Sequence, residues 1–338
     1  MRKDGVFPST SRGCSVRIRP LAALSVAAMS AILLAGCAGS AEPDATSTPS
    51  SSAAASDCGL DPQPGADSDA ITVSGTAPEL TAEVPADLEF AELQRTIAES
   101  ADGEDLAVGE LVSGQYLIID PATSEVLLDS ATTTPDDSGL VPIIVDGSGI
   151  FGSSVLCTPL GSSTAFTIPG SMLGEGAANA VVVAQSIDQL PTVATGAEQD
   201  PVEGMPEVEL DDDGAPTITV PDEEPPTEVQ IADLKLGEGA TVGSGDTVFV
   251  QYLGVKWSDG TEFDSSWSRG TPAQFQTTGV VAGFQQALEG QTVGSQVLVV
   301  IPPAAGYGEG EINDADLTGE TLVFVIDILG VQRAAAQQ

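Results

Sequence analysis

The last hundred residues of the chain predict an α+β fold, in which an antiparallel β-sheet covers one short helix. Three stretches in this region alternate β-branched and aromatic residues as strands do: Val248 to Leu253, Val297 to Ile301 and Leu322 to Leu329. In the last stretch Phe324 and Asp327 lie on opposite faces, which is typical of a half-buried strand. Only Phe284 to Leu288, which Gly290 closes, has the pattern of a short helix.

Four short motifs follow one another in the same region. They are Val250-Gln251-Tyr252-Leu253-Gly254, Asp259-Gly260-Thr261-Glu262-Phe263-Asp264-Ser265-Ser266, Gly283-Phe284 and Ala305-Gly306-Tyr307-Gly308. Any one of them alone is weak, but their order and spacing over residues 229–331 resemble the FKBP class of peptidyl-prolyl cis-trans isomerases. The resemblance implies the same α+β fold and the same activity, which is rotation about the peptide bond that precedes proline.

The resemblance also implies a set of site residues. The residues at the family's catalytic positions are Tyr252, Phe263, Asp264, Arg269, Phe284, Tyr307 and Phe324. Those at its substrate-binding positions are Phe275, Val280, Val281 and Leu317. Tyr307 would donate a hydrogen bond to the substrate backbone, and Tyr252 and Arg269 would hold Asp264. No cofactor or metal is expected, because an apolar pocket that strips water from the amide favours the less dipolar, twisted transition state.

The sequence departs from the family pattern at three places. Phe284 stands where a tryptophan is usual, Ala273 replaces a wall aromatic, and the acidic loop from Glu309 to Gly319 lacks the usual proline elements. We therefore expect weaker macrolide binding and a shifted substrate preference. Without the shared motif order, the aromatic residues would also fit ordinary core packing, and Asp264 with Arg269 would fit an exposed ion pair of little value.

The N-terminal segment predicts export. Five basic residues precede an apolar run from Leu21 to Ala35, and Leu34-Ala35-Gly36-Cys37 closes it, so residues 1–36 have the pattern of a secretory signal. The run is shorter than the roughly 20 residues of a membrane-spanning helix. Its last four residues resemble a bacterial lipobox, which implies lipid on Cys37 and anchoring at the outer face of the cytoplasmic membrane. The alternative is an ordinary cleavage site beside a chance cysteine.

The charge of the chain restricts its partners. The formal net charge is −40, and removal of residues 1–36 leaves 5 basic and 49 acidic residues, or −44. Such a surface repels nucleic acid and anionic lipid headgroups. The expected partners are proline-containing unfolded or exported polypeptides, with the membrane reached only through lipid on Cys37. We expect a monomer.

Cysteine and histidine usage restricts the chemistry. Cys14 lies in the predicted signal and Cys37 would carry the lipid, so Cys58 and Cys157 are the free thiols of the mature chain. In an oxidising compartment we expect these two cysteines to form a disulfide. A redox-active cysteine is the alternative, but no Cys-x-x-Cys spacing is present. The absence of histidine excludes Ser-His-Asp catalysis and histidine zinc sites. A carboxylate-pair hydrolase is a weak third hypothesis, because nothing singles out one acid and one base.

Composition divides the mature chain into four segments. Residues 37–57 are a flexible tether, 58–190 and 229–333 are domain-sized, and 191–228 read as an acidic linker with twelve acidic and no basic residues. Within that linker Thr217 to Val220 alternate like a short strand, which would pack on a neighbouring domain rather than float.

The two domain-sized segments resemble each other. Leu127-Leu128-Asp129-Ser130 aligns with Glu262-Phe263-Asp264-Ser265, and Leu173 then falls at the position of Tyr307. No arginine follows Asp129 at the required distance, so residues 58–190 are expected to be a degenerate FKBP-like domain without catalysis. That domain would be a scaffold or an apolar groove for unfolded clients, unless the similarity is chance. For the whole chain, the alternative to an isomerase is a non-catalytic lipoprotein chaperone or interaction module.

Overall fold

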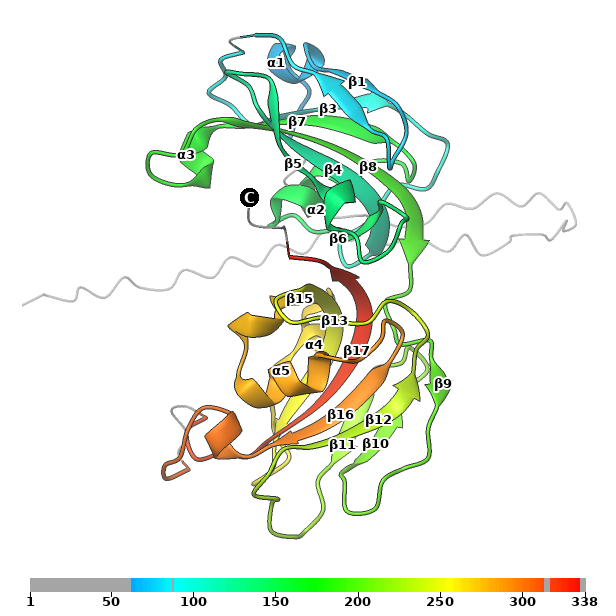
Figure 1. Cartoon of the computed structure of the whole chain (residues 1–338), viewed down its shortest axis with the longest axis vertical. Coiled ribbons are helices and arrows are strands. Elements are labelled where there is room, and N and C mark those ends of the chain that lie inside the picture. The colour runs from blue at the N-terminus through cyan, green and yellow to red at the C-terminus, as the bar shows by residue number, and fades with distance from the viewer. Residues whose placement is uncertain (1–61, 87, 313–316, 335–338) are drawn as a thin grey trace, which may run out of the picture. The chain divides into compact units, whose positions relative to one another are not determined.

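A computed structural model describes residues 62–86, 88–312 and 317–334. The predicted signal, the lipid-bearing Cys37, the tether and Cys58 lie outside the described residues, so the pairing of Cys58 with Cys157 stays a prediction. The described residues form a six-stranded sheet and a seven-stranded sheet, and two separate two-stranded sheets. We call residues 62–190 the first unit and residues 191–334 the second unit (Figure 1). Within the described part of the chain, no helix has the length and apolar character needed to cross a bilayer.

The second unit is a strongly bent antiparallel sheet that wraps around one helix (Figure 1). Its strands are β9 (Ala197–Glu198), β10 (Glu207–Leu210), β11 (Pro216–Thr219), β12 (Gln230–Leu236), β13 (Thr247–Lys256), β14 (Glu262–Ser265), β15 (Ala273–Gln276), β16 (Gln296–Ile301) and β17 (Leu322–Gln332). Its helices are α4 (Ser266–Arg269) and α5 (Ala282–Leu288), with single 3₁₀ turns η2 (Thr277–Gly279) and η3 (Pro303–Ala305). The strand order is β14-β13-β17-β16-β12-β9, and β15 also pairs with β13.

This architecture confirms the predicted α+β fold, including the three strands and the short helix. One face of β17 packs Phe324, Ile326 and Ile328 against α5, as the alternation indicated. The expectation of half-buried strands was wrong, however, because every residue of β17 before Gln332 is buried. Val323 and Val325 on the outer face belong to a second apolar cluster on the other side of the sheet.

The segment expected to be an acidic linker forms part of the second unit and covers that outer face. Strands β10 and β11 pair as a hairpin, whose Ile218 packs in the outer cluster with side chains of β13, β16 and β17. The indole N–H of Trp257 also donates to the carbonyl of Glu223 at 3.0 Å. Acidic residues on the hairpin face solvent while alternate apolar ones face the sheet. The alternation seen in Thr217 to Val220 is thus the covering strand of a domain.

A buried carboxylate holds the start of the same segment. Asp327, opposite Phe324 on β17, is 2% exposed and accepts hydrogen bonds from the Ala194 N–H at 2.8 Å and Gln296 Nε2 at 2.7 Å. Lys235 Nζ donates to the carbonyl of Ala194 at 3.1 Å. Burial raises the pKa of Asp327, and these hydrogen bonds oppose the shift. Asp327 therefore binds the segment around Ala194 to the sheet.

The first unit repeats the same plan. Its strands are β1 (Thr72–Ser74), β2 (Thr81–Glu83), β3 (Gln94–Glu99), β4 (Leu111–Asp120), β5 (Glu125–Asp129), β6 (Val141–Ile144), β7 (Ser163–Ile168) and β8 (Ala180–Leu190). Its helices are α1 (Ala66–Asp69), α2 (Ile150–Val155) and α3 (Gly170–Leu173), with a 3₁₀ turn η1 (Ser130–Thr133). The order β5-β4-β8-β7-β3, with β6 on β4, matches β14-β13-β17-β16-β12, with β15 on β13. A hairpin, β1–β2, again packs on the outer face.

The strand registers correct our sequence alignment of the two units by one residue. In each unit the edge pairing skips one residue at a bulge, which is Leu127 in β5 and Phe263 in β14. Leu128 therefore corresponds to Asp264, and Asp129 corresponds to Ser265 rather than to Asp264. The error arose because both stretches contain an Asp-Ser pair, and a local alignment matches the two pairs although they stand one strand position apart.

Candidate active site

An aromatic cluster lies between α5 and the inner face of the second sheet. Tyr252, Phe284 and Phe324 are 4, 4 and 5% exposed, and the rings of Phe284 and Phe324 meet edge to face at 5.0 Å between centroids. Phe263 packs on Phe324 at 5.3 Å, and Phe275 packs on Phe284 at 5.7 Å. Such edge-to-face pairs are favourable beyond the area that they bury. The cluster thus forms an apolar wall of closely packed rings.

Two glycines of the sequence motifs let these rings approach the backbone. A Cβ on Gly254 would lie 2.7 Å from an atom of the Phe324 ring and 2.8 Å from one of Phe263. A Cβ on Gly283 would lie 2.4 Å from a methyl carbon of Ile301. Both distances are too short for any side chain at these positions. The motifs therefore require glycine because ring stacking and helix packing leave no room.

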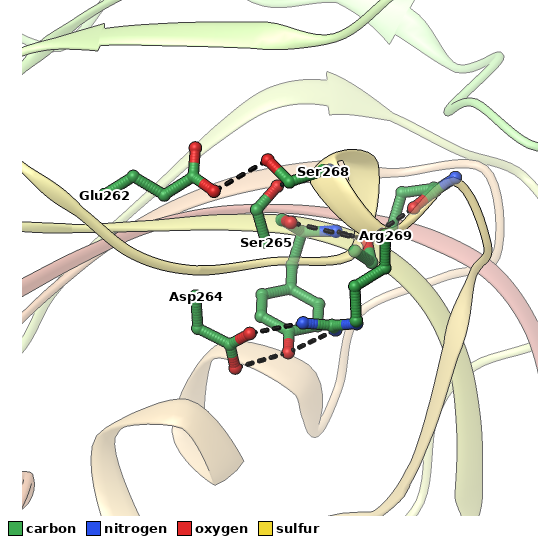
Figure 2. A network of polar contacts seen from close by, with 8 residues as sticks. Glu262, Asp264, Ser265, Ser268 and Arg269 are labelled. Carbon is green, nitrogen blue, oxygen red and sulfur yellow. Dashed lines mark hydrogen bonds and ion pairs between the residues drawn. The ribbon is translucent and has the colours of Figure 1, made fainter. Parts of the chain in front are cut away.

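Beside the cluster, three polar groups form a closed network (Figure 2). The Tyr252 hydroxyl donates to Asp264 Oδ2 at 2.6 Å, and one Arg269 nitrogen, Nη2, donates to the Tyr252 oxygen at 2.8 Å. The other guanidinium nitrogen of Arg269 pairs with Asp264 Oδ1. The Asp264 and Arg269 side chains are 45 and 46% exposed, so the pair lies at the mouth of the cluster. Because one partner is the buried tyrosine, the network fixes the position of that ring.

Local structure explains why Asp264 and Arg269 meet. Asp264 is in β14 and Arg269 ends the single-turn helix α4, which Ser265 caps by accepting a hydrogen bond from the Ser268 N–H at 3.2 Å. Figure 2 shows a second link, in which the Ser268 hydroxyl donates to Glu262 at 2.7 Å. The tight turn returns the chain so that the arginine reaches back over the strand to the carboxylate.

Burial and the network shift two pKa values. Burial is the main cause that raises the pKa of Tyr252 to about 12, and the hydrogen bond to Asp264 adds to the rise while that from Arg269 opposes it. For Arg269, burial disfavours the charge, but its hydrogen bonds to Tyr252 and Asp264 outweigh burial and raise the pKa. The site therefore holds a neutral phenol and a charged guanidinium at physiological pH.

The raised pKa of Tyr252 predicts a loss of stability in alkali. An ordinary tyrosine releases its proton near pH 10, whereas folded Tyr252 keeps it up to about pH 12. This contribution to the free energy of unfolding is complete below pH 10 and is lost as the pH rises through about 12. Urea unfolding across this window should show a smaller fall in Tyr252→Phe than in the unchanged chain. Tyr307→Phe is the control, and an equal effect of both variants would contradict the assignment.

Three of the four remaining residues of the predicted site pack on the same cluster. Val280, Val281 and Leu317 are partly buried against it, as is Ala273 on β15. Tyr307 is 54% exposed, and its hydroxyl makes no hydrogen bond to any residue that the structure describes. The geometry thus brings Val280, Val281 and Leu317 to the aromatic cluster, while Tyr307 lies exposed in the loop that follows η3.

Sequence reasoning overlooked one residue that positions the site. Ser266 is fully buried, and its hydroxyl accepts a hydrogen bond from the Tyr252 N–H at 2.7 Å while donating to the side chain of Gln251. It ties α4, and hence Arg269, to the strand that carries Tyr252. The internal repeat contained the signal, because Ser130 accepts in the same way from the Tyr116 N–H at 2.9 Å.

Comparison with known proteins matches this site to one family. Residues 238–329 match the family model of the FKBP-type peptidyl-prolyl cis-trans isomerases. A probable FK506-binding protein of Corynebacterium glutamicum is 43% identical over 114 residues, which are 34% of this chain and 96% of that protein. The chain belongs to this family. An FK506-binding protein of Streptomyces anulatus is 40% identical over 119 residues, again 34% of this chain and 96% of the relative.

The second unit is therefore an FKBP-type peptidyl-prolyl cis-trans isomerase, and the alternative of a chain without enzymatic activity is not supported. The FKBP-type match covers residues 238–329 of the second unit. A longer relative, the outer membrane protein MIP of Legionella longbeachae, is 37% identical over 110 residues, or 32% of this chain and 47% of that protein. The match spans about half of that relative.

Proposed function

We propose that the chain is a lipid-anchored prolyl isomerase that assists the folding of exported polypeptides at the outer face of the cytoplasmic membrane. The observation that carries the proposal is the aromatic cluster with its Tyr252–Asp264–Arg269 network, in a chain whose residues 1–36 have the pattern of a secretory signal. The name of the Legionella relative, an outer membrane protein, agrees with a location in the cell envelope.

The aromatic cluster supplies what amide rotation needs. The barrier of roughly 18–20 kcal/mol arises because the planar amide is stabilised by resonance with separated charge. The rotating amide has lost this charge separation, so a dry wall of aromatic rings stabilises it relative to the planar ground state. We assign this wall to Phe263, Phe284 and Phe324, with Phe275, Val280, Val281 and Leu317 contacting the residues that flank the bond.

The polar groups orient the reaction rather than transfer protons. Asp264 and Arg269 hold the Tyr252 hydroxyl, which keeps that ring edge-on to Phe275 and Phe284. Tyr307, whose hydroxyl is free of hydrogen bonds to the described residues, donates to a carbonyl of the bound peptide. When this hydrogen bond holds the carbonyl in place, the peptide rotates about the X-Pro bond alone. The side chains on either side of that bond then pack on the apolar wall.

Removal of the Tyr307 hydroxyl should lower kcat/KM by up to about tenfold, because one net hydrogen bond contributes about 0.5–1.5 kcal/mol. The test is the cis-to-trans rate of a proline tetrapeptide with the chain from Ala38 onward, in the unchanged form and in Tyr307→Phe. Ile312→Ala, which removes a side chain 59% exposed in the same loop, should keep the full rate. No acceleration by the unchanged, folded chain would refute the activity itself.

Lipid on Cys37 is tested separately. The unchanged protein should fractionate with membranes and carry a diacylglyceryl group at Cys37 in its intact mass, whereas Cys37→Ser should be released or keep its signal. An unmodified, secreted mature protein would remove the anchor from the proposal and leave the isomerase untouched. Cys14→Ser, a change within the signal, controls for effects on export.

A further inference from the structure

The loop that follows β16 begins and ends on the core of the isomerase site. Ala305 in η3 and Leu317, near the end of the loop, both pack against the cluster that contains the aromatic rings of the site. A Cβ on Gly306 would lie 3.6 Å from a methyl carbon of Ile301, which belongs to the same cluster. The residues of the loop that the structure describes therefore border the aromatic cluster.

The backbone fixes the place of Glu309 in this loop. The carbonyl of Gly308, just before it, accepts a hydrogen bond from the Gly319 N–H at 2.8 Å. A Cβ on Gly310, just after it, would lie 2.5 Å from the methyl carbon of Thr318. Both neighbours of Glu309 are thus held against the end of the loop that packs on the cluster.

The described residues do not compensate the charge of Glu309. This residue is exposed and forms no hydrogen bond or ion pair within the described part of the chain. The guanidinium of the site, on Arg269, is already bound to Asp264 and to the Tyr252 oxygen. Residues 191–334 contain 25 acidic and 4 basic residues, so the field around the loop is negative.

Charge beside the cluster distinguishes peptides that the rings do not. Aromatic rings accept a prolyl ring whatever residues flank it, whereas a carboxylate attracts a basic side chain and repels an acidic one. A lysine or arginine beside the X-Pro bond would reach Glu309 while both charges stay in solvent. The effect is therefore modest and sensitive to salt.

We propose that Glu309 is a specificity-determining residue of the isomerase. It favours X-Pro bonds with lysine or arginine beside them and disfavours those with aspartate or glutamate. The substrate class is thus basic, proline-containing polypeptide. The inference rests on the proposed function only in that the aromatic cluster binds the X-Pro bond, and it requires neither export nor lipid on Cys37.

The same charge disfavours the chain's own proline-containing segments. Residues 38–57 contain Pro43 and Pro49 with three acidic and no basic residues, and residues 191–228 contain twelve acidic and no basic ones. Like charges repel these segments from the loop. A basic client therefore competes well with proline residues of the isomerase itself.

The ratio of two rates tests the preference in the chain from Ala38 onward. The probes are the p-nitroanilides of acetyl-Lys-Lys-Pro-Phe and acetyl-Glu-Glu-Pro-Phe, and the ratio is kcat/KM for the lysine peptide over that for the glutamate peptide. Glu309→Gln should lower the ratio by about fivefold at about 0.02 M salt, and Glu309→Lys should lower it further. At about 0.5 M salt these differences should shrink, because screening weakens both attraction and repulsion. Damage to the fold would lower both rates alike and leave the ratio unchanged.

Glu209→Gln is the matched control, because it removes the same charge from an exposed position on β10, on the hairpin that covers the outer face of the sheet. It should leave the ratio unchanged within about twofold. A ratio that neither Glu309 variant lowers, or that Glu209→Gln lowers as much as Glu309→Gln does, would overturn the inference. No acceleration of an uncharged proline tetrapeptide by the folded, unchanged chain would instead refute the proposed function, so the two failures are distinguishable.

Discussion

Phe284→Ala should lower kcat/KM for a proline tetrapeptide by about 10- to 100-fold, since full burial of a phenylalanine is worth roughly 1.5–3 kcal/mol and each 1.4 kcal/mol is a factor of ten. Phe284 contacts Tyr252, Phe275 and Phe324 through its ring, so its truncation removes three ring contacts from the wall. The measurement is the cis-to-trans rate at matched concentrations of folded protein, checked by circular dichroism.

Two further variants separate catalysis from folding. Because Phe284 is buried, its removal should also lower the free energy of unfolding, by about 3–5 kcal/mol. Phe166→Ala removes the same volume from the first unit at a site 2% exposed, and should cost similar stability while the tetrapeptide rate of the folded fraction stays unchanged. Phe284→Trp restores the residue usual in the family and should keep most of the activity. An alanine variant that is folded and fully active would remove Phe284 from the site.

The second large effect is expected far from the site, on the outer face of the second sheet. Ile218→Ala should lower the free energy of unfolding by about 2–5 kcal/mol, because Ile218 is 8% exposed and packs against Leu253, Val255 and Val323. A fragment that starts at residue 229 would lack the whole hairpin and expose this apolar face, so it should aggregate where a fragment starting at residue 191 stays soluble.

Alternation along β11 supplies the control for this prediction. Thr219 lies on the exposed side of the same strand, and Thr219→Ala should change stability by no more than about 0.5 kcal/mol. Urea unfolding of the full-length variants measures both. Equal, small effects at the two positions would show that the hairpin does not stabilise the sheet, and a soluble, equally stable fragment from residue 229 would lead to the same conclusion.

The site residues could be found before the structure because they lie in contiguous motifs. Tyr252, Asp264 and Tyr307 each lie in a short motif that also contains a glycine, and Gly254 and Gly283 are required by the close approach of rings and helix. The sequence did not show which residues from different motifs lie close together in space. The hydrogen bond of Ser266 to the Tyr252 N–H joins residues fourteen positions apart, and no local pattern announces it.

Local patterns in the sequence determined the strands β13, β16 and β17, the helix α5 and the order of the catalytic motifs, because alternation and turn chemistry act over a few residues. Tertiary structure alone decided which surfaces are covered. The acidic segment 191–228 had the composition of a linker, yet its alternate apolar residues meet an apolar face whose exposure would be costly. The same covering buries Asp327 and its partners, and the pairing of β5 with β4 places Leu128, not Asp129, at the position that Asp264 has in the second unit. Burial and strand register arise from contacts between distant residues, and for this reason only the folded chain reveals them.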